Sequence, residues 1–211
     1  MAWRLEEGLA FLAAKDKRMA AAIGEIGGLT RQPMEGLFSA LAQSIIGQQI
    51  SLKAADSVWR RVVALLGEVT PETVFTAAEE DLRACGMSGR KAGYLRGAAE
   101  AAVTGAIDFA ALETAEDEDI IAQLTRLRGV GRWTAEMLLI FALGRQDVMS
   151  YDDYGLRKGL QLLYHHQDMP RARFERYRRR FSPYGTAASL VLWEITGGRA
   201  PRACAWKNHH D

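Results

Sequence analysis

Residues Leu124–Glu136 read LTRLRGVGRWTAE and join two helical patterns with almost no chain between them. An amphipathic run ends at Gly129-Val130-Gly131, and a strongly apolar run begins directly after it. Glycine permits backbone conformations and close approaches that a side chain prevents. The start of the second helix would offer unpaired N–H groups and a positive dipole end to a phosphate. The stretch predicts a tight helical hairpin, whose glycines serve either a bound phosphate or only the bend.

Helical periodicity continues outward from this hairpin, because Ala, Leu, Glu and Arg fill long stretches and alternating β-branched runs are absent. Proline, glycine and capping residues mark the ends of the segments. The expected helices cover residues 5–23, 34–46, 52–66, 90–103, 118–127, 133–143, 153–164, 171–181 and 183–196, with short helices after Pro71 and before Gly86. The connecting loops are short, so we expect a compact all-α protein with an irregular segment from Gly197 onward.

The chain of 211 residues, 48% hydrophobic and 25% charged, is long enough to bury one sizeable core or two lobes that share an interface. Its net charge of +1 does not by itself indicate a nucleic-acid partner. The charges are unevenly placed, because residues 171–180 read RARFERYRRR and residues 113–119 read ETAEDED. The arginine run is either a basic face that follows phosphates or an ordinary solvated helix face.

Residue types and spacing argue against metal centres and membrane spans. Cys85 and Cys204 are far apart and lack CxxC spacing, which excludes a zinc site or an iron–sulfur cluster built from thiolates. The histidines at positions 165, 166, 209 and 210 have no partners at ligand spacing. No run approaches about 18 apolar residues, and MAWRLEEGLA is not a secretory signal. We expect a soluble protein in a reducing cytoplasm, associated with the nucleoid if the cell is bacterial.

The hairpin string Leu-x-Gly-Val-Gly-x-x-Thr-Ala resembles the helix-hairpin-helix (HhH-GPD) DNA glycosylase superfamily, in its 3-methyladenine DNA glycosylase II type. The usual form has proline where this chain has Arg128, and the likeness extends from about Leu37 to Thr196. It implies an all-α fold of two lobes with the active cleft between them. Residues 36–130 would form a central lobe that ends in the hairpin, and residues 1–35 plus 131–211 a second lobe with the catalytic aspartate. An additional N-terminal β domain is not expected.

The resemblance also assigns DNA contacts to the hairpin and to the end of an upstream helix. In this family, hairpin backbone carbonyls hold a monovalent cation, Na⁺ or K⁺, that bridges to a phosphate; by position these carbonyls belong to Thr125, Leu127 and Val130. Contacts that position DNA are implied for Gln48, Gln49, Ile50, Ser51, Lys53, Gly129, Gly131, Arg132 and Thr134. Lys53 and the run Ser88–Lys91 resemble positions near the cleft or the phosphates.

Polar residues interrupt the apolar helix pattern in LFSALAQSIIGQQISLKA, residues 37–54. The string resembles the family segment S-I-I-x-Q-Q-I-S, whose loop inserts a side chain into the DNA stack where a base has been extruded. By position this wedge is Gln49, with Ile50 as the other candidate, although relatives often place an apolar residue there. Alternatively, the glutamines bond only to each other or to a backbone carbonyl.

Two neighbouring aspartates, Asp152 and Asp153, stand downstream of the hairpin at the spacing that the superfamily shows. Taken alone, both are candidate helix N-caps, since aspartate commonly begins a helix. In the family the second aspartate is the catalytic carboxylate. Because neighbouring residues point in different directions on a helix, we assign capping to Asp152 and chemistry to Asp153.

A single carboxylate suits the cleavage of an N-glycosidic bond. The transition state resembles an oxocarbenium ion, with positive charge on C1′ and O4′ of the sugar. An anion in a dry pocket stabilises that charge and can orient or deprotonate the attacking water. N3-methyladenine and N7-methylguanine nucleotides already carry a positive charge on the base, so the base leaves without an enzymatic acid.

The hairpin lysine of the family's lyase members is replaced here by Trp133, and no lysine occurs between Lys91 and Lys158. Schiff-base chemistry from the hairpin helix is therefore excluded by residue type, which leaves attack by water. Trp133 and Trp193 match the family positions that stack on an extruded, cationic base, or else they only pack in the core. The base pocket is assigned to Trp133, Trp193, Phe38, Glu136 and Met137, of which the last three would tune base choice.

Together these features predict a monofunctional enzyme of base excision repair, an N-glycosyl hydrolase of the DNA-3-methyladenine glycosylase II type. It would flip alkylated bases such as 3-methyladenine and 7-methylguanine out of double-stranded DNA and excise them, as a monomer without a cofactor apart from the hairpin cation. A non-catalytic lesion-binding hairpin protein, a glycosylase for mismatched or other damaged bases, and a bifunctional lyase are the alternatives.

Overall fold

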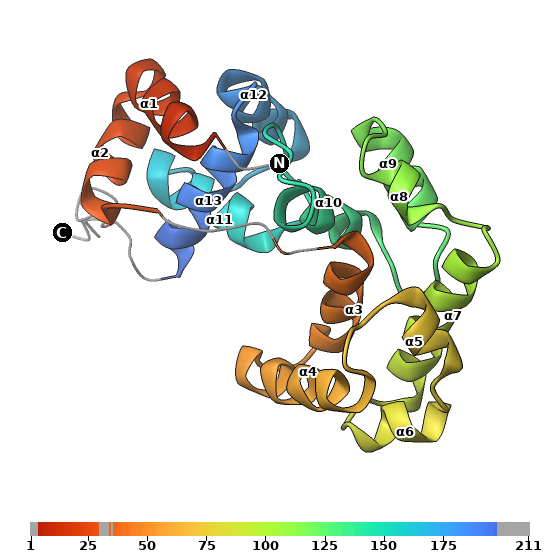
Figure 1. Cartoon of the computed structure of the whole chain (residues 1–211). Helices are drawn as coiled ribbons and strands as arrows, with labels where there is room; N and C mark the ends of the chain where they lie inside the picture. Colours follow the sequence, from red (N-terminus) through yellow and green to blue (C-terminus); the bar gives the residue numbers. More distant parts are fainter. Residues whose placement is uncertain (1–3, 30–33, 35, 198–211) are drawn as a thin grey trace. The chain divides into compact units, whose positions relative to one another are not determined.

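The structure, a computed structural model, describes residues 4–29, 34 and 36–197. Within these residues it contains thirteen α-helices and no strand (Figure 1). The predicted all-α fold is confirmed for this part of the chain. Most of the segment predicted to be irregular, together with Cys204 and the histidines at 209 and 210, lies outside the described residues. No helix in the described part is long and apolar enough to cross a membrane.

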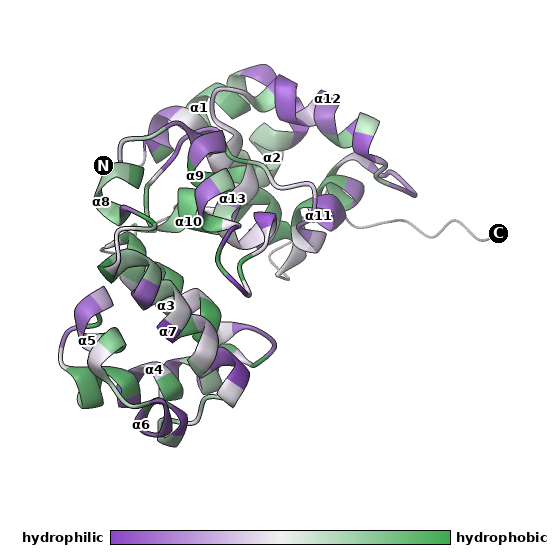
Figure 2. Ribbon diagram, turned by 90° about the vertical axis from the view of Figure 1, so that its right-hand side faces the viewer, coloured by the Kyte–Doolittle hydropathy of each residue, from purple (hydrophilic) through white to green (hydrophobic). Residues whose placement is uncertain are grey.

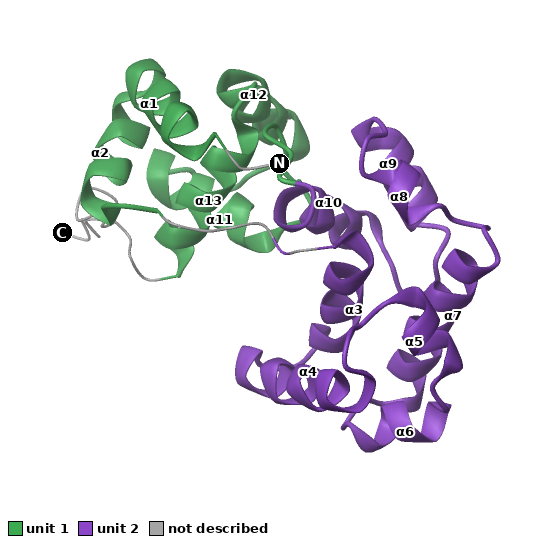
Figure 3. Cartoon of the chain, viewed as in Figure 1, with its two compact units in different colours: residues 1–33, 144–211 green, residues 34–143 purple. Residues whose placement is uncertain are grey.

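The chain divides into two compact units, residues 34–143 and residues 1–33 with 144–211 (Figure 3). The sequence predicts these boundaries at 35/36 and 130/131. The difference concerns helix α10, Arg132–Phe141, which packs against α9, Asp117–Leu124, and α3, Leu37–Gly47. Because both of these neighbours belong to the 34–143 unit, α10 belongs to it as well, and the whole hairpin lies in that unit.

In the 34–143 unit, α3 and α7 contact each other, and α4, α5, α6 and α10 each pack against one of them. Helix α3 contacts α4, α7 and α10, and α7 contacts α5 and α6. The elements besides α3, α9 and α10 are α4 (Leu52–Leu66), α5 (Pro71–Thr76), α6 (Glu79–Ala84), α7 (Gly89–Val103) and α8 (Phe109–Leu112). The short helix α8 was not expected from the sequence; it begins where the Asp108 side chain accepts a hydrogen bond from the Ala111 N–H at 3.0 Å.

Local capping explains why several ends in this unit agree with expectation. Helix α4 begins after Ser51, whose hydroxyl accepts from the Ala54 N–H at 3.3 Å, and ends at Gly67 with φ +74°. Helix α7 begins after Ser88, whose hydroxyl accepts from the Lys91 N–H at 3.4 Å. Each hydroxyl satisfies one of the N–H groups that a helix leaves unpaired at its first turn.

In the other unit, α13, Gly185–Thr196, packs against each of the other four helices: α1 (Leu5–Lys15), α2 (Lys17–Ile26), α11 (Tyr154–Tyr164) and α12 (Arg171–Phe181). Its residues are mainly hydrophobic, whereas those of α12 are mainly hydrophilic (Figure 2). Gly159 of α11 allows the closest approach, because a Cβ there would lie 2.7 Å from the Leu192 carbonyl oxygen. The core of this unit is therefore built around α13.

The prediction of one helix over residues 5–23 is wrong. The helix breaks at Asp16, which has extended backbone at φ −143° and ψ 114°. Its side chain accepts from the N–H groups of Arg18 and Met19 at 2.9 and 3.1 Å. An aspartate within an apolar periodic run can thus start a new helix instead of continuing the first, because its carboxylate satisfies the unpaired N–H groups.

Candidate functional site

Asp153 lies at the N-terminus of α11 with only 7% of its surface exposed. Its Oδ1 accepts hydrogen bonds from the Leu156 N–H at 2.8 Å and from the Trp193 indole Nε1 at 3.0 Å. Asp153 is therefore the N-cap of α11, and our assignment of capping to Asp152 is wrong. The helix starts one residue later than predicted, at Tyr154, so the cap moves with it. The residue chosen for chemistry thus also holds the helix in place.

The first turn of α11 leaves little space around this carboxylate. A Cβ at Gly155 would lie 2.9 Å from Trp193 Cδ1 and 3.1 Å from Asp153 Oδ1. Only glycine therefore fits beside the indole and the carboxylate without displacing one of them. Tyr154, which precedes this glycine, is 71% exposed and was not singled out from the sequence. The sequence signal that could have identified Tyr154 and Gly155 is their position directly after Asp153, in the first turn of the predicted helix.

A basic and aromatic cluster lies next to Asp153 in the same unit and was also missed from the sequence. The guanidinium carbons of Arg157 and Arg171 lie 5.3 and 5.2 Å from the Tyr151 ring centroid. The hydroxyl of Ser150 and Nε of Arg157 are buried and have no hydrogen-bond partner in the described residues. Cations over an aromatic ring are stabilised by its quadrupole. The cluster places positive charge within a few residues of the carboxylate.

The two glycines of the hairpin have different roles. Gly129 has φ +84°, and a Cβ there would lie 2.2 Å from the Tyr94 ring. Gly131 has ordinary extended backbone at φ −93° and ψ 171°, and a Cβ there would meet nothing within 4 Å. The turn therefore requires glycine only at position 129. At Gly131 the open space, rather than the backbone conformation, is the feature that a phosphate contact would use.

Gln48 supports this turn from the end of α3, because its Nε2 donates to the Gly129 carbonyl at 2.9 Å. This confirms, for Gln48, the alternative that a glutamine here bonds to a backbone carbonyl. Gln49 is exposed and has φ +58°, a conformation unusual for a residue with a side chain. Ile50 is 41% exposed and Leu52 is 90% exposed. Leu52 is an apolar wedge candidate that the sequence comparison did not select.

Arg132 begins α10 and is held by two carboxylates of its own unit. Its guanidinium donates to both oxygens of Glu118, at 3.1 and 2.6 Å, and its Nε donates to Glu136 Oε1 at 3.0 Å. Hydrogen bonding to Glu118, with the negative charges of both carboxylates, raises the pKa of Arg132 despite partial burial. The predicted DNA contact at Arg132 and the predicted base contact at Glu136 are thus engaged with one another.

The predicted base-pocket residues fall into both units. In the 34–143 unit, Trp133 is 42% exposed, whereas Phe38, Glu136 and Met137 are buried. Phe38 packs edge-on against Phe109, with ring centroids 5.4 Å apart. In the other unit, the partly buried Trp193 is bonded to Asp153. Of the five predicted pocket residues, Trp133 is the most exposed to solvent.

Several predicted DNA contacts differ in accessibility. Ser51 and Lys53 are exposed near the N-terminus of α4, whereas Thr134 is buried in the first turn of α10. Lys91 donates from Nζ to the Ile46 carbonyl at 2.8 Å, and burial lowers the pKa of Lys91. A cation at the C-terminal end of α3 suits the helix dipole. Lys91 therefore joins α7 to α3.

The backbone hydrogen bonds of the hairpin leave carbonyl lone pairs that a monovalent cation could use. The Leu127 carbonyl accepts from the Val130 N–H at 3.2 Å, and within the described residues the carbonyls of Thr125 and Val130 accept no backbone hydrogen bond outside helices. Carbonyl oxygens suit hard cations, and a bonded carbonyl keeps a second lone pair. Among the described side chains, no group of three or more His, Cys, Asp or Glu residues is arranged to hold a metal ion.

Comparison with known proteins places the chain in a family. Residues 42–183 match the HhH-GPD superfamily of base excision DNA repair proteins. The chain is 36% identical to DNA-3-methyladenine glycosylase 1 of Schizosaccharomyces pombe over 79% of this chain and 73% of that protein. The crystal structure of a Bacillus halodurans DNA-3-methyladenine glycosidase aligns with a TM-score of 0.81 and 36% identity, over 93% and 92% of the chains.

A second solved structure, that of the Schizosaccharomyces pombe 3-methyladenine DNA glycosylase in complex with abasic DNA, aligns with a TM-score of 0.79 and 31% identity. It covers 90% of this chain and 97% of that one. These likenesses agree with the all-α fold described above. The chain therefore belongs to the HhH-GPD superfamily of base excision DNA repair proteins.

Proposed function

We propose that this protein is a monofunctional DNA glycosylase that hydrolyses the N-glycosidic bond of alkylated, cationic bases in double-stranded DNA. The observation that carries the proposal is the carboxylate of Asp153, which is nearly buried and is held by the Trp193 indole and the Leu156 N–H. Relatives named 3-methyladenine glycosylases, and one of them in complex with abasic DNA, support the substrate class. The hairpin of α9 and α10 supports DNA as the partner.

The reaction needs one anion and one water molecule. As the bond between C1′ and the base nitrogen breaks, the base leaves with the electron pair and the sugar gains positive charge. The Asp153 carboxylate stabilises that charge, and fixed hydrogen bonds spare it the reorganisation that a solvated carboxylate would undergo. Water then adds to C1′, and its proton passes to Asp153 or to solvent. The products are the free base and an abasic site.

A cationic base fits this arrangement because it becomes neutral when it leaves. An alkylated purine such as 3-methyladenine or 7-methylguanine needs no proton from the enzyme, so one carboxylate is sufficient. Trp133, which is 42% exposed, would offer a π surface to an electron-poor ring. Because the lyase lysine is replaced by Trp133, the chain has no hairpin amine for a Schiff base.

DNA contact is assigned to the hairpin, with Gly131 as the point of close approach. The open space around Gly131 and the N-terminus of α10 suit a backbone phosphate, and carbonyls of Thr125, Leu127 and Val130 would hold a Na⁺ or K⁺ ion. Such an ion would supply positive charge toward the phosphate. We further propose that the protein acts as a monomer in the cytoplasm.

The proposal is tested by mass spectrometry of bases released from dimethyl-sulfate-treated duplex DNA. Wild type is expected to release 3-methyladenine and 7-methylguanine, and Asp153→Asn to release neither above background. The matched control is Asp152→Asn, which makes the same charge change one residue away and is expected to retain release. Binding of the treated DNA without any release by wild type would instead identify a non-catalytic lesion-binding protein.

Two further measurements separate the remaining alternatives. Release of oxidised or mismatched neutral bases in preference to methylated purines would contradict a pocket for cationic bases. A covalent adduct with DNA after borohydride reduction would identify a lyase.

Glu136→Gln tests base choice, since loss of the carboxylate should weaken selection of cationic bases. An excision profile identical to that of wild type would remove Glu136 from the pocket.

A further inference from the structure

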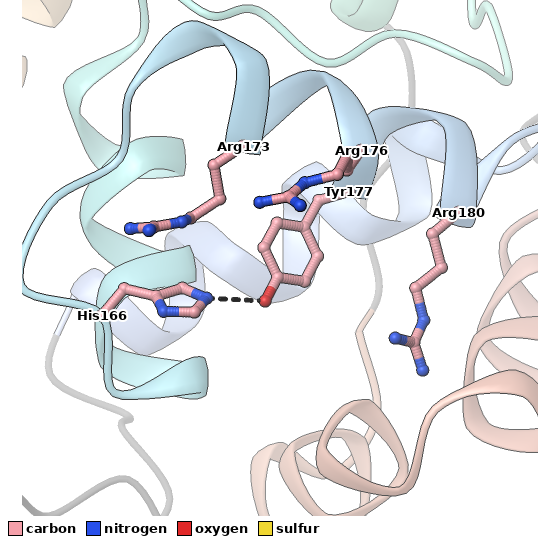
Figure 4. Close-up of a pocket in the computed structure, with 5 residues that line it drawn as sticks. All are labelled: His166, Arg173, Arg176, Tyr177 and Arg180. Atoms are coloured by element: carbon pink, nitrogen blue, oxygen red, sulfur yellow. Dashed lines mark hydrogen bonds between the residues drawn. The ribbon is translucent and has the colours of Figure 1, made fainter.

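A basic pocket lies between α12 and the segment that follows α11, within the unit of residues 4–29 and 144–197. It has a volume of about 280 Å³ and is lined by Arg173, Arg176, Tyr177, Arg180 and His166 (Figure 4). Small-molecule pockets usually start near about 300 Å³, so this one suits a small group. His166 follows the C-terminal end of α11, whereas Asp153 precedes its N-terminal end. The 11 residues of α11 separate them by roughly 16 Å at 1.5 Å per residue.

The lining residues on α12 share one face because they are spaced three, four and seven positions apart. Figure 4 shows the guanidinium groups of Arg173 and Arg176 on the same side of α12 as the Tyr177 ring, with His166 facing them. His166 Nε2 and the Tyr177 hydroxyl are hydrogen-bonded at 2.8 Å. The arginine run that the sequence left as either a phosphate face or a solvated face thus contributes three of its members to one hollow.

The charges around the pocket are not balanced. Arg180 pairs with Asp16 at 2.9 Å, and Arg173 pairs with Asp168. Within the described residues, Arg176 makes no ion pair or hydrogen bond through its side chain. Partial burial, together with the positive charges of Arg173, Arg18 and Arg176, lowers the pKa of His166 even though Asp168 opposes this. The local field therefore favours an anion.

We propose that this pocket binds one phosphate group, which Arg176 and Arg173 contact through their guanidinium forks. Guanidinium groups match phosphate oxygens in pairs, and the Tyr177 hydroxyl and the His166 ring nitrogen supply further polar contacts. The phosphate belongs either to a DNA backbone or to a free phosphate or phosphorylated small molecule. The site is separate from Asp153 and does not depend on base excision; only the DNA source rests on the proposed function.

The first arm of the test uses inorganic phosphate with the full chain, followed by NMR of the His166 ring and by thermal unfolding at constant ionic strength. Wild type should show saturable changes in the His166 signals and a rise in Tm, which chloride does not reproduce. Arg176→Ala should weaken the apparent affinity at least about tenfold, since a charge-assisted hydrogen bond to the phosphate is lost. Arg176→Lys should restore part of it, because it keeps the charge and loses the fork.

The matched control is Arg179→Ala, which removes the same charge from an exposed position on α12 that does not line the pocket. The second arm measures the salt dependence of binding to undamaged duplex DNA. Loss of one phosphate contact should lower the slope of log K against log salt by about 0.9 in Arg176→Ala, and by less in Arg179→Ala. Neither arm measures base release, so a failure here is distinguishable from a failure of the proposed glycosylase.

The two arms have four outcomes. Changes in both arms, or in the DNA arm alone, identify a backbone phosphate as the ligand. A response to inorganic phosphate that depends on Arg176, with an unchanged DNA slope, identifies a free or small-molecule phosphate. Equal behaviour of the Arg176→Ala and Arg179→Ala variants in both arms would overturn the proposal and leave the arginine run as a solvated helix face.

Discussion

The indole Nε1 of Trp193 donates to Oδ1 of Asp153 across 3.0 Å, and the same oxygen accepts from the Leu156 N–H at 2.8 Å. One atom of the carboxylate therefore ties the last turn of α13 to the N-terminus of α11. Asp153 therefore stabilises the fold and is also the proposed catalytic carboxylate, so variants are needed that change one of these roles and keep the other.

Asp153→Asn should separate them, because an asparagine Oδ1 still accepts both hydrogen bonds while the negative charge is lost. We expect a free energy of unfolding close to that of wild type and no base release. Asp153→Ala removes the cap and leaves the indole without its acceptor, at a cost of about 1 kcal/mol or more. Urea denaturation of both variants checks this. Equal destabilisation would mean that the cap does not survive in Asp153→Asn.

Trp193→Phe keeps an aromatic ring but removes the donor to Asp153. A charge-assisted hydrogen bond contributes about 1.5–3 kcal/mol, so the single-turnover rate of base release should fall about tenfold to a hundredfold. The matched control is Trp133→Phe, which makes the same replacement in the other unit and should reduce the rate less. Single-turnover measurement with methylated duplex DNA decides this. Equal losses would indicate that both rings act only by stacking.

Gly155→Ala should inactivate the protein without the stability gain usual for such a change. Alanine favours a helix over glycine by about 1 kcal/mol, yet a Cβ here would lie 2.9 Å from Trp193 Cδ1. Gly97→Ala in α7 is the matched control, because a Cβ at this exposed position meets nothing within 4 Å. That variant should gain stability and retain base release. Thermal unfolding and release assays on both variants test the difference.

The hairpin glycines should respond differently to alanine. Gly129→Ala forces a side chain into a positive-φ position and against the Tyr94 ring, so the protein should lose about 1–3 kcal/mol of stability or fail to fold. Gly131→Ala should fold normally, because the space around Gly131 is open. It should nevertheless weaken duplex binding, since the methyl group occupies the space assigned to a phosphate. Normal DNA affinity of Gly131→Ala would move the phosphate elsewhere.

His166 predicts a pH dependence of stability. Partial burial and neighbouring arginines hold the pKa of His166 below its ordinary value, so the folded protein resists protonation more than the unfolded chain. In phosphate-free buffer, the free energy of unfolding should fall as pH drops below about 6.5 and level off below the folded pKa. The difference between wild type and His166→Gln, followed by urea denaturation, isolates this contribution. A pH-independent difference would contradict it.

Helix type and most helix positions could be predicted from the sequence because they follow from local signals. Residues 171–181 and 52–66 carry strong periodicity and clear end signals, and both segments agree with the structure. The break at Asp16 could not be predicted, because it depends on acceptance from two N–H groups and on tertiary partners. Tyr164 donates its hydroxyl to Asp16 at 2.8 Å, and Arg180 pairs with it, although both residues lie far away in sequence.

The family motif predicts that Asp153 and Trp193 share a site, and the structure brings them together through a hydrogen bond, while their roles stay predictions. The hydrogen bonds within the site could not be predicted, because they depend on the exact residue at which each helix begins. The N-cap of α11 is Asp153 and not Asp152, and the Gln48 side chain donates a hydrogen bond to the Gly129 carbonyl. Tyr154, Gly155 and Leu52 match no motif. Only position in the sequence could have identified them: Tyr154 and Gly155 follow Asp153, and Leu52 follows the exposed loop after α3.

Helices α1 and α2 pack against α13, so two segments that are far apart in the sequence complete one core, while residues 34–143, which lie between them in the sequence, form a continuous unit. During synthesis the first helices leave the ribosome long before their partner exists. Leu12 and Met19, fully buried in the finished protein, must therefore wait with apolar surface uncovered. The middle unit can fold first, and the nascent chain stays vulnerable to aggregation and proteases until α13 has been synthesised.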